Sequence, residues 1–272
     1  MRTKGVIRNR MITNRLSRVI VLGCLLCLPL LVCIVVGFGG TNKVTSDNDS
    51  LQKRYKEALE ILASVPGITN FVASEFLGGI RPANHALHTQ VEIESEVKKG
   101  IKILNKIVSE GKEPDGIYLI LGSAYTRILD LKNSIYFYEM SIKKEPAREL
   151  AYINLLGVLW DGGDYKKALE LIEQYKMRFP SKQYEYHFFK GVTHQRDMDY
   201  RKAIDEFMNA LQVKPDSAET RVALGTAYLY NQEFERAEQQ FNLAIHARPE
   251  LKAQVEQNKT DWKLFEEKKA GR

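Results

Sequence analysis

The chain has no cysteine after residue 33, and this absence limits the chemistry open to most of it. The three cysteines, Cys24, Cys27 and Cys33, all fall in one apolar stretch near the N-terminus. The remaining chain therefore holds no disulfide and no zinc site built from cysteine. A body without cysteine is compatible with an exported protein but does not establish export.

Catalytic and metal-binding motifs are also missing. The sequence contains no G-x-S-x-G, no glycine-rich phosphate loop and no H-E-x-x-H. Of the five histidines, His187 and His194 stand seven residues apart at positions that the repeats described below assign to a helical core. We therefore predict a protein that is not an enzyme and that carries no cofactor and no metal.

Acidic residues are absent from residues 1–18, which carry six basic ones. The rest of the chain has 34 basic residues against 34 acidic ones, so it is formally neutral. A nucleic-acid-binding protein usually shows a basic body. The excess of positive charge thus indicates a basic tail, and no nucleic-acid partner is predicted.

Charge of either sign is absent from residues 19–38, an apolar run of 20 residues. A helix of about 20 apolar residues spans a bilayer core, so we predict a transmembrane signal-anchor in contact with the lipid bilayer. The basic tail should stay cytoplasmic, which places the chain after residue 38 on the other side. Two alternatives stay open: a signal peptide cleaved near Gly37 or Gly39, and a lipoprotein signal at Cys24. The polar residues 41–50 are predicted to be a linker.

Between residues 115 and 251, small, aromatic and proline residues recur about every 34 residues. The prolines Pro146, Pro180, Pro215 and Pro249 lie 34, 35 and 34 residues apart. Each unit predicts two helices joined by a short turn, such as 162–164 or 231–233, and a proline that ends the second helix. The small positions include Gly122, Gly191, Gly225, Ser134, Ala168, Ala203 and Ala237, and the large ones Tyr125, Tyr138, Tyr228, Phe207 and Phe241.

This pattern resembles the tetratricopeptide repeat, W-x2-L-G-x2-Y followed by A-x3-F and P. The resemblance implies an all-α fold, a right-handed superhelical solenoid of helix-turn-helix repeats, here preceded by one transmembrane helix. Its four repeats would be 115–148, 149–182, 184–217 and 218–251. The second departs from the pattern, because Leu156 replaces the expected glycine and Tyr175 replaces a small residue. Its first helix is therefore expected to be rotated, or its helices to be spaced more widely.

Two flanking regions are also predicted to be helical. Residues 51–114 form a degenerate helical extension, with one helix over 51–65 and a longer one over about 86–110. Residues 252–267, with Val255 and Trp262 among their apolar positions, form a helix that caps the exposed core of the last repeat.

Tetratricopeptide domains usually bind ligands on a concave face lined by the first helix of each repeat. The resemblance assigns nine residues to this partner-binding groove: Leu119, Arg127, Ile153, Trp160, Phe188, Arg196, Val222, Leu229 and Tyr230. Most are apolar, which favours a protein or peptide segment with apolar residues as partner. Two alternatives remain: these side chains pack inside the solenoid, or they pack under residues 66–90. The sequence also leaves open whether Trp160 faces the groove or the core.

These features together predict a single-pass protein of the bacterial inner membrane, with its N-terminus in the cytoplasm and its repeats in the periplasm. If the signal is cleaved, the protein is soluble and exported. The expected function is protein–protein interaction, as a scaffold or assembly factor of an envelope complex. The alternatives are a non-catalytic platform subunit of an envelope enzyme and a carrier for a lipid or glycan.

Overall fold

A computed structural model describes residues 46–63, 65 and 90–270, and within these residues the chain consists of helices and turns without a strand. The predicted basic tail 1–18 and the predicted span 19–38 lie outside the described residues. The last five residues of the predicted linker, 46–50, belong to the first described helix. None of the described helices is both long enough and apolar enough to cross a membrane.

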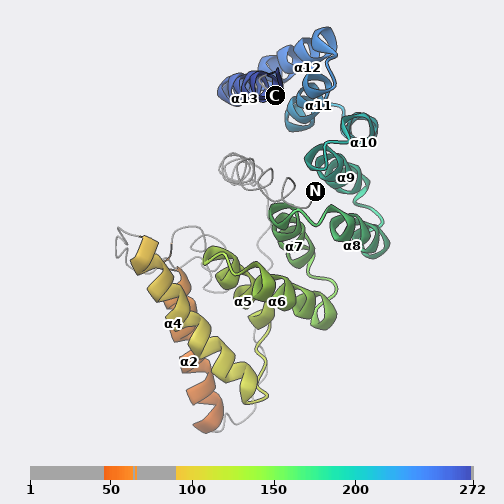
Figure 1. The fold of residues 1–272 in the computed structure, drawn as a ribbon. Helices are drawn as coiled ribbons and strands as arrows, with labels where there is room; N and C mark the ends of the chain where they lie inside the picture. The colour runs from red at the N-terminus through yellow and green to blue at the C-terminus, as the bar shows by residue number, and fades with distance from the viewer. Residues whose placement is uncertain (1–45, 64, 66–89, 271–272) are drawn as a thin grey trace, which may run out of the picture. The chain divides into compact units, whose positions relative to one another are not determined.

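The described residues fall into two compact units, which we call the N-terminal unit (46–158) and the C-terminal unit (159–270). The N-terminal unit holds α2 (Ser46–Ala63), α4 (Gln90–Ser109), α5 (Ile117–Arg127), α6 (Leu131–Lys144) and most of α7 (Glu149–Gly162) (Figure 1). The C-terminal unit holds the end of α7, α8 (Tyr165–Arg178), α9 (Gln183–Arg196), α10 (Tyr200–Val213), α11 (Ala218–Tyr230), α12 (Phe234–Ala247), the short 3-10 helix η1 (Pro249–Leu251) and α13 (Lys252–Ala270).

The helices from α5 to α12 come in pairs that keep the phase of the sequence pattern, so the predicted all-α fold of tetratricopeptide-like helical repeats is confirmed at this level. Each second helix ends two residues before its proline, because proline has no amide hydrogen to continue the ladder. Three of the second helices begin at an aspartate whose carboxylate accepts a hydrogen bond from the backbone three residues on: Asp130, Asp164 and Asp199.

A glycine under an aromatic ring joins the two helices in three of the pairs. A Cβ atom on Gly122 would lie 2.5 Å from the ring of Tyr138, and one on Gly191 would lie 2.6 Å from Phe207. The third pair repeats the arrangement with Gly225 and Phe241, at 2.7 Å. No side chain fits between these helices, which explains the small residues of the pattern.

The second repeat lacks this contact between a glycine and an aromatic ring. Leu156 and Tyr175 are both fully buried, so the larger side chains are accommodated in the interior. The ring of Tyr175 packs against Phe179 and Phe189, with centroids 4.9 and 5.5 Å apart. The neighbouring Gly157 has open space where a Cβ atom would be.

Helices α2 and α4 form an antiparallel hairpin in the N-terminal unit. The Arg54 guanidinium donates to both oxygens of the Glu110 carboxylate, at 2.8 and 2.6 Å, which pairs the middle of α2 with the end of α4. Further along, Leu62 packs directly against Gly100. The hairpin continues into one hydrophobic core with α5, which includes the fully buried Leu104.

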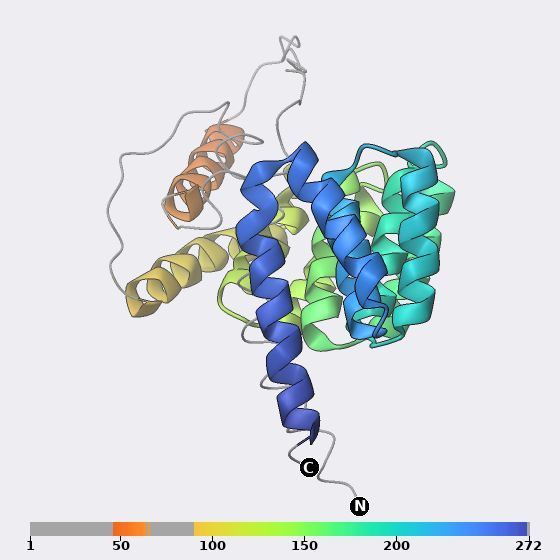
Figure 2. The ribbon, with the colours of Figure 1, turned by 90° about the horizontal axis from the view of Figure 1, so that it is seen from above.

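In the C-terminal unit, α13 packs against α11 and lies beside α12 at the end of the repeats (Figure 2). Val255 is fully buried in the same core as Phe207 and Phe241. The indole of Trp262 packs edge-on against Phe234, with centroids 5.2 Å apart. Helix α13 thus packs on the core of the last repeat, and it runs three residues beyond the predicted end at 267.

Candidate interaction surface

The first helices of the C-terminal unit form one continuous face, because α9 contacts α11 and α11 contacts α13. This first-helix face is where the resemblance places the predicted groove. Phe188 and Arg196 lie on α9, and Val222, Leu229 and Tyr230 lie on α11.

Val222 and Leu229 lie inside the protein. Their side chains are 3% and 7% exposed and belong to the core built around Phe207 and Phe241. Phe188 is half-buried and packs against that core, with its ring stacked 5.9 Å from the ring of Tyr184. Of these predicted groove residues, Phe188 is thus the apolar one with part of its surface uncovered.

Trp160 is buried against α9. Its indole nitrogen donates to the Thr193 hydroxyl at 2.9 Å, and the Arg196 guanidinium lies 5.5 Å from the ring centroid. Arg196 also pairs with Asp161 at 3.5 Å. Burial raises the pKa of Asp161, although the Arg196 charge acts in the opposite direction. The question that the sequence left open for Trp160 is therefore answered in favour of the core.

Tyr230 lies at the end of α11 between two other rings. It stacks on Tyr200 at 5.2 Å and meets Phe265 of α13 at 5.4 Å between centroids. Burial raises the pKa of Tyr230 and brings that of Tyr200 to about 12. All three side chains are only half-buried, so this aromatic cluster combines a fixed geometry with accessible surface.

The predicted groove residues of the N-terminal unit are also covered to different degrees. Leu119 is fully buried, whereas Arg127 and Ile153 are half-buried. Burial of this kind does not decide whether a half-buried residue contacts a partner, so the partner-binding role of the nine residues stays a prediction.

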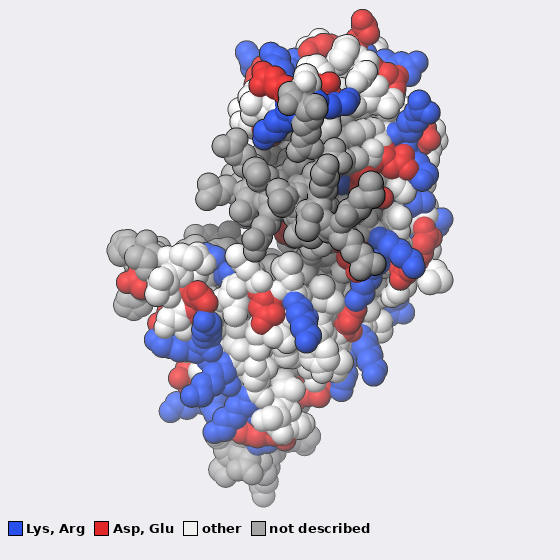
Figure 3. Space-filling model, in the orientation of Figure 1, with Lys and Arg blue, Asp and Glu red and all other residues white. Residues whose placement is uncertain are grey.

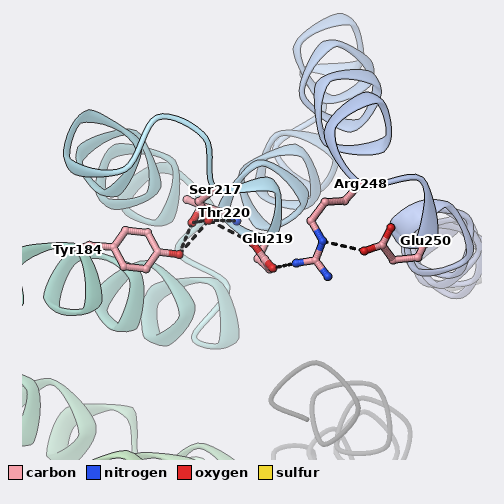
Figure 4. A network of polar contacts seen from close by, with 6 residues as sticks. All are labelled: Tyr184, Ser217, Glu219, Thr220, Arg248 and Glu250. Atoms are coloured by element: carbon pink, nitrogen blue, oxygen red, sulfur yellow. Dashed lines mark hydrogen bonds and ion pairs between the residues drawn. The ribbon is translucent and has the colours of Figure 1, made fainter. Parts of the chain in front are cut away.

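A network of polar side chains, which the sequence analysis missed, fixes the start of the first-helix face (Figure 4). The Tyr184 hydroxyl lies 2.9 Å from both the Ser217 and the Thr220 hydroxyls. Ser217 is the N-cap of α11 and accepts from the Thr220 amide. Beyond it, Arg248 pairs with Glu219 of α11 and with Glu250 of η1. A serine before a helix, such as Ser217, can be recognised in the sequence as an N-cap. The contact of Tyr184 with the next repeat has no such sequence signal.

A second polar cluster joins α9 to α10. Nδ1 of His187 lies 2.7 Å from the Glu206 carboxylate, and the Lys190 ammonium lies 2.9 Å from its other oxygen. Burial alone would raise the pKa of Glu206, but the hydrogen bonds from His187 and Lys190 lower it. Burial lowers the pKa of the nearby His194. Both histidines are half-buried, not fully in the core.

Among the described residues, no group of three His, Cys, Asp or Glu side chains is placed to hold a metal ion. A hollow of about 270 Å³ in the N-terminal unit is lined by Glu113, Pro114, Asp115, Tyr118, Lys144 and Glu145. Its carboxylates are engaged within the protein, since Glu113 binds Lys144 and Tyr118, and Glu145 accepts from the Gly116 amide.

Comparison with known protein families gave no match, and comparison with curated proteins gave none either. Solved structures of MamA are similar in fold. MamA from Desulfovibrio magneticus RS-1 is 16% identical, with 60% of this chain and 95% of that chain covered and a TM-score of 0.49. A crystal structure of MamA is 15% identical over 58% of this chain and 91% of that chain, also at a TM-score of 0.49. MamA from MSR-1 is 20% identical, with 57% and 89% covered, at 0.44. A likeness of this degree transfers neither function nor partner.

Proposed function

We propose that this protein is a membrane-anchored scaffold whose helical repeats bind an apolar segment of another protein on the first-helix face. The predicted span 19–38 holds it in the bacterial inner membrane, with its N-terminus in the cytoplasm and the repeats in the periplasm. The assembly that it serves is an envelope complex. An envelope enzyme that uses the chain as a non-catalytic platform would engage the same face.

The observation that carries this proposal is the set of half-buried aromatic side chains held rigidly on that face. Tyr184 and Phe188 stack on each other on α9, and the hydroxyl of Tyr184 is fixed by Ser217 and Thr220. Aromatic side chains that are already ordered lose little entropy when a partner covers them. Residues of this type dominate the binding energy of most protein interfaces.

A second reason is that the buried residues of this face support it, while the half-buried residues are open to a partner. Val222 and Leu229 belong to the core, so they support the face without contacting a partner. Phe188 and Tyr230 keep exposed surface, and each Å² of apolar area that a partner covers contributes about 25 cal/mol before the cost of association.

Site-specific photo-crosslinking in intact membranes tests the binding face. A photoreactive residue at position 188 should capture a defined partner, and the same residue at position 177 should not, because Met177 is 77% exposed on the second helix α8. The double variant Phe188→Ala/Tyr230→Ala should release this partner, whereas Met177→Ala/Leu243→Ala should retain it. Equal capture from both positions, or a partner that stays bound to the first variant, would refute the proposed face.

Circular dichroism separates loss of binding from loss of fold. Neither Phe188 nor Tyr230 is fully buried, so we expect the variant to keep its helicity. The topology has its own test: the repeats should resist extraction by carbonate and be digested by protease in spheroplasts but not in intact cells.

A further inference from the structure

Helix α4 has two opposite faces of different chemistry. Its buried face consists of Ile93, Val97, Gly100, Ile101, Leu104 and Ile107. Lys98, Lys102 and Lys106 follow each other at intervals of four residues, with Lys99 beside them, and all four are exposed. At about 100° per residue, these lysines share the side of the helix turned away from the core. Figure 3 shows basic side chains gathered over the C-terminal half of α4. We call these four residues the lysine face.

The positive charge of this face is only partly neutralised. Lys98 pairs with Glu94 at 2.7 Å and Lys99 with Glu96 at 2.6 Å. Within the described part of the chain, Lys102 and Lys106 take part in no ion pair. The acidic residues of α4 all lie in its N-terminal half: Glu92, Glu94 and Glu96. Glu110, just after the helix, is engaged by Arg54. The C-terminal half of α4 therefore presents Lys102 and Lys106, and the neighbouring carboxylate of Glu110 is already bound by Arg54.

The antiparallel hairpin sets where this charge lies along the chain. Arg54, midway along α2, contacts Glu110, so the C-terminal end of α4 points in the same direction as the N-terminal end of α2. Residue 46 follows the predicted span 19–38 after eight steps of the chain. Eight residues reach at most about 29 Å, which keeps this end of the hairpin close to the bilayer surface.

We infer that the lysine face of α4 lies on an anionic phospholipid surface, the headgroup layer of the membrane in which the chain is anchored. The inference rests on the anchoring part of the proposed function and adds a second membrane contact to it. Each lysine near an anionic surface strengthens the association about fivefold, so the face orients the N-terminal unit relative to the membrane. The contact is electrostatic, and salt therefore weakens it.

Lysine footprinting of the full chain in vesicles tests this inference. The chain is reconstituted into phosphatidylcholine vesicles with or without phosphatidylglycerol, and the rate at which each lysine is acylated by a membrane-impermeant reagent is measured by mass spectrometry. Lys102 and Lys106 should react at least about fivefold more slowly in the anionic vesicles, and this protection should disappear in high salt. Lys132 and Lys143, exposed on α6, should react equally in both. Equal rates at Lys102 and Lys106 would overturn the inference.

A charge-reversal variant provides the matched control. Lys98 and Lys99 belong to the same face and should also react more slowly in the anionic vesicles. Lys102→Glu/Lys106→Glu should abolish this protection of Lys98 and Lys99, whereas Lys132→Glu/Lys143→Glu, with the same change in net charge, should leave it intact. The substituted side chains are exposed in both variants, so the helices are retained. Loss of protection in both variants would overturn the inference, because it would assign the effect to net charge alone.

Carbonate extraction keeps this test distinct from that of the anchor. A chain that resists extraction but shows no protection refutes the lysine face and leaves the anchor intact. A chain that is extracted refutes the anchor, and its co-sedimentation with phosphatidylglycerol vesicles then decides the lysine face, with no sedimentation as the negative outcome. Protection in native membranes but not in anionic vesicles would assign the face to a protein and overturn the lipid proposal.

Discussion

Two kinds of helical hairpin in this protein pack their helices through different contacts. One kind is found in the repeats, in α9/α10 and α11/α12, and the other is α2/α4. In the repeats, a glycine lies under an aromatic ring, and the two helices are joined by a turn of a few residues. In α2/α4, Gly100 lies under the flexible side chain of Leu62, and residues 64–89 separate the helices. The repeats thus encode their geometry locally, whereas α2/α4 depends on contacts between residues far apart in the sequence.

The largest expected effect on stability comes from removing the aromatic ring that packs on the glycine of a repeat, and it tests the difference between the two kinds of hairpin. Phe207→Ala should lower the free energy of unfolding by about 3–5 kcal/mol, because Phe207 is fully buried and Gly191 offers no side chain to fill the cavity. Leu62→Ala in the other hairpin removes fewer atoms and should cost about 2–4 kcal/mol. Urea denaturation followed by circular dichroism measures both. A smaller loss for Phe207→Ala than for Leu62→Ala would break the comparison.

Replacing the glycines by alanine gives a second test of the difference between the repeat hairpins and α2/α4. Gly191→Ala places a Cβ atom 2.6 Å from the rigid ring of Phe207 and should destabilise by about 1–3 kcal/mol. At Gly100 the neighbour is the movable end of Leu62, so the clash and the gain in helix propensity should nearly cancel. Gly157→Ala is the control, since nothing lies within 4 Å, and should stabilise by up to about 1 kcal/mol. Equal losses at positions 191 and 100 would contradict a special role for the ring.

The four turns that join the helices of the repeats supply a smaller effect. Leu129, Met198 and Gln232 adopt left-handed backbone angles, with φ of 61°, 64° and 65°, and Gly163 occupies the equivalent place in the second repeat. Leu129→Gly should stabilise by about 0.5–1 kcal/mol, because the side chain is 79% exposed and its backbone strain is relieved. Gly163→Ala should destabilise by about 1 kcal/mol. Thermal unfolding of the two variants would show shifts of opposite sign.

The local character of the repeats explains why so much of the fold was predictable from the sequence. Prolines, turn residues and small positions recur about every 34 residues, and each acts within one hairpin. The Tyr184 bonds to Ser217 and Thr220 join residues 33 and 36 positions apart and depend on how one repeat stacks on the next. No pattern within a single repeat specifies them.

The same reason explains why the predicted groove residues divide into buried and half-buried sets. The resemblance assigns Val222 and Phe188 to equivalent places on their helices, but their surroundings differ. Val222 is enclosed in the core of the last repeats, while Phe188 keeps part of its ring uncovered beside Tyr184. Coverage depends on the neighbouring repeat, which a repeat frame does not describe.

The smallest expected effect on stability comes from one ion-paired carboxylate in the repeats and one in the α2/α4 hairpin. Glu206 in the repeats and Glu110 in the hairpin both have lowered pKa values: Glu206 through His187 and Lys190, which outweigh its burial, and Glu110 through Arg54. A carboxyl group with a pKa below its ordinary value of 4.5 stabilises the fold above that pH, and the contribution is lost as the pH falls toward the lowered pKa.

Glu206→Gln should therefore flatten the decline of stability between about pH 5 and pH 3, by less than about 1 kcal/mol because the group is partly exposed. Glu110→Gln should act in the same direction but respond more to salt, since the side chain of Glu110 is more open to solvent than that of Glu206. Urea denaturation across this pH range, at low and high salt, gives both slopes. A stronger salt response for Glu206 would mean that the repeats, like α2/α4, rely on exposed charge for part of their pairing.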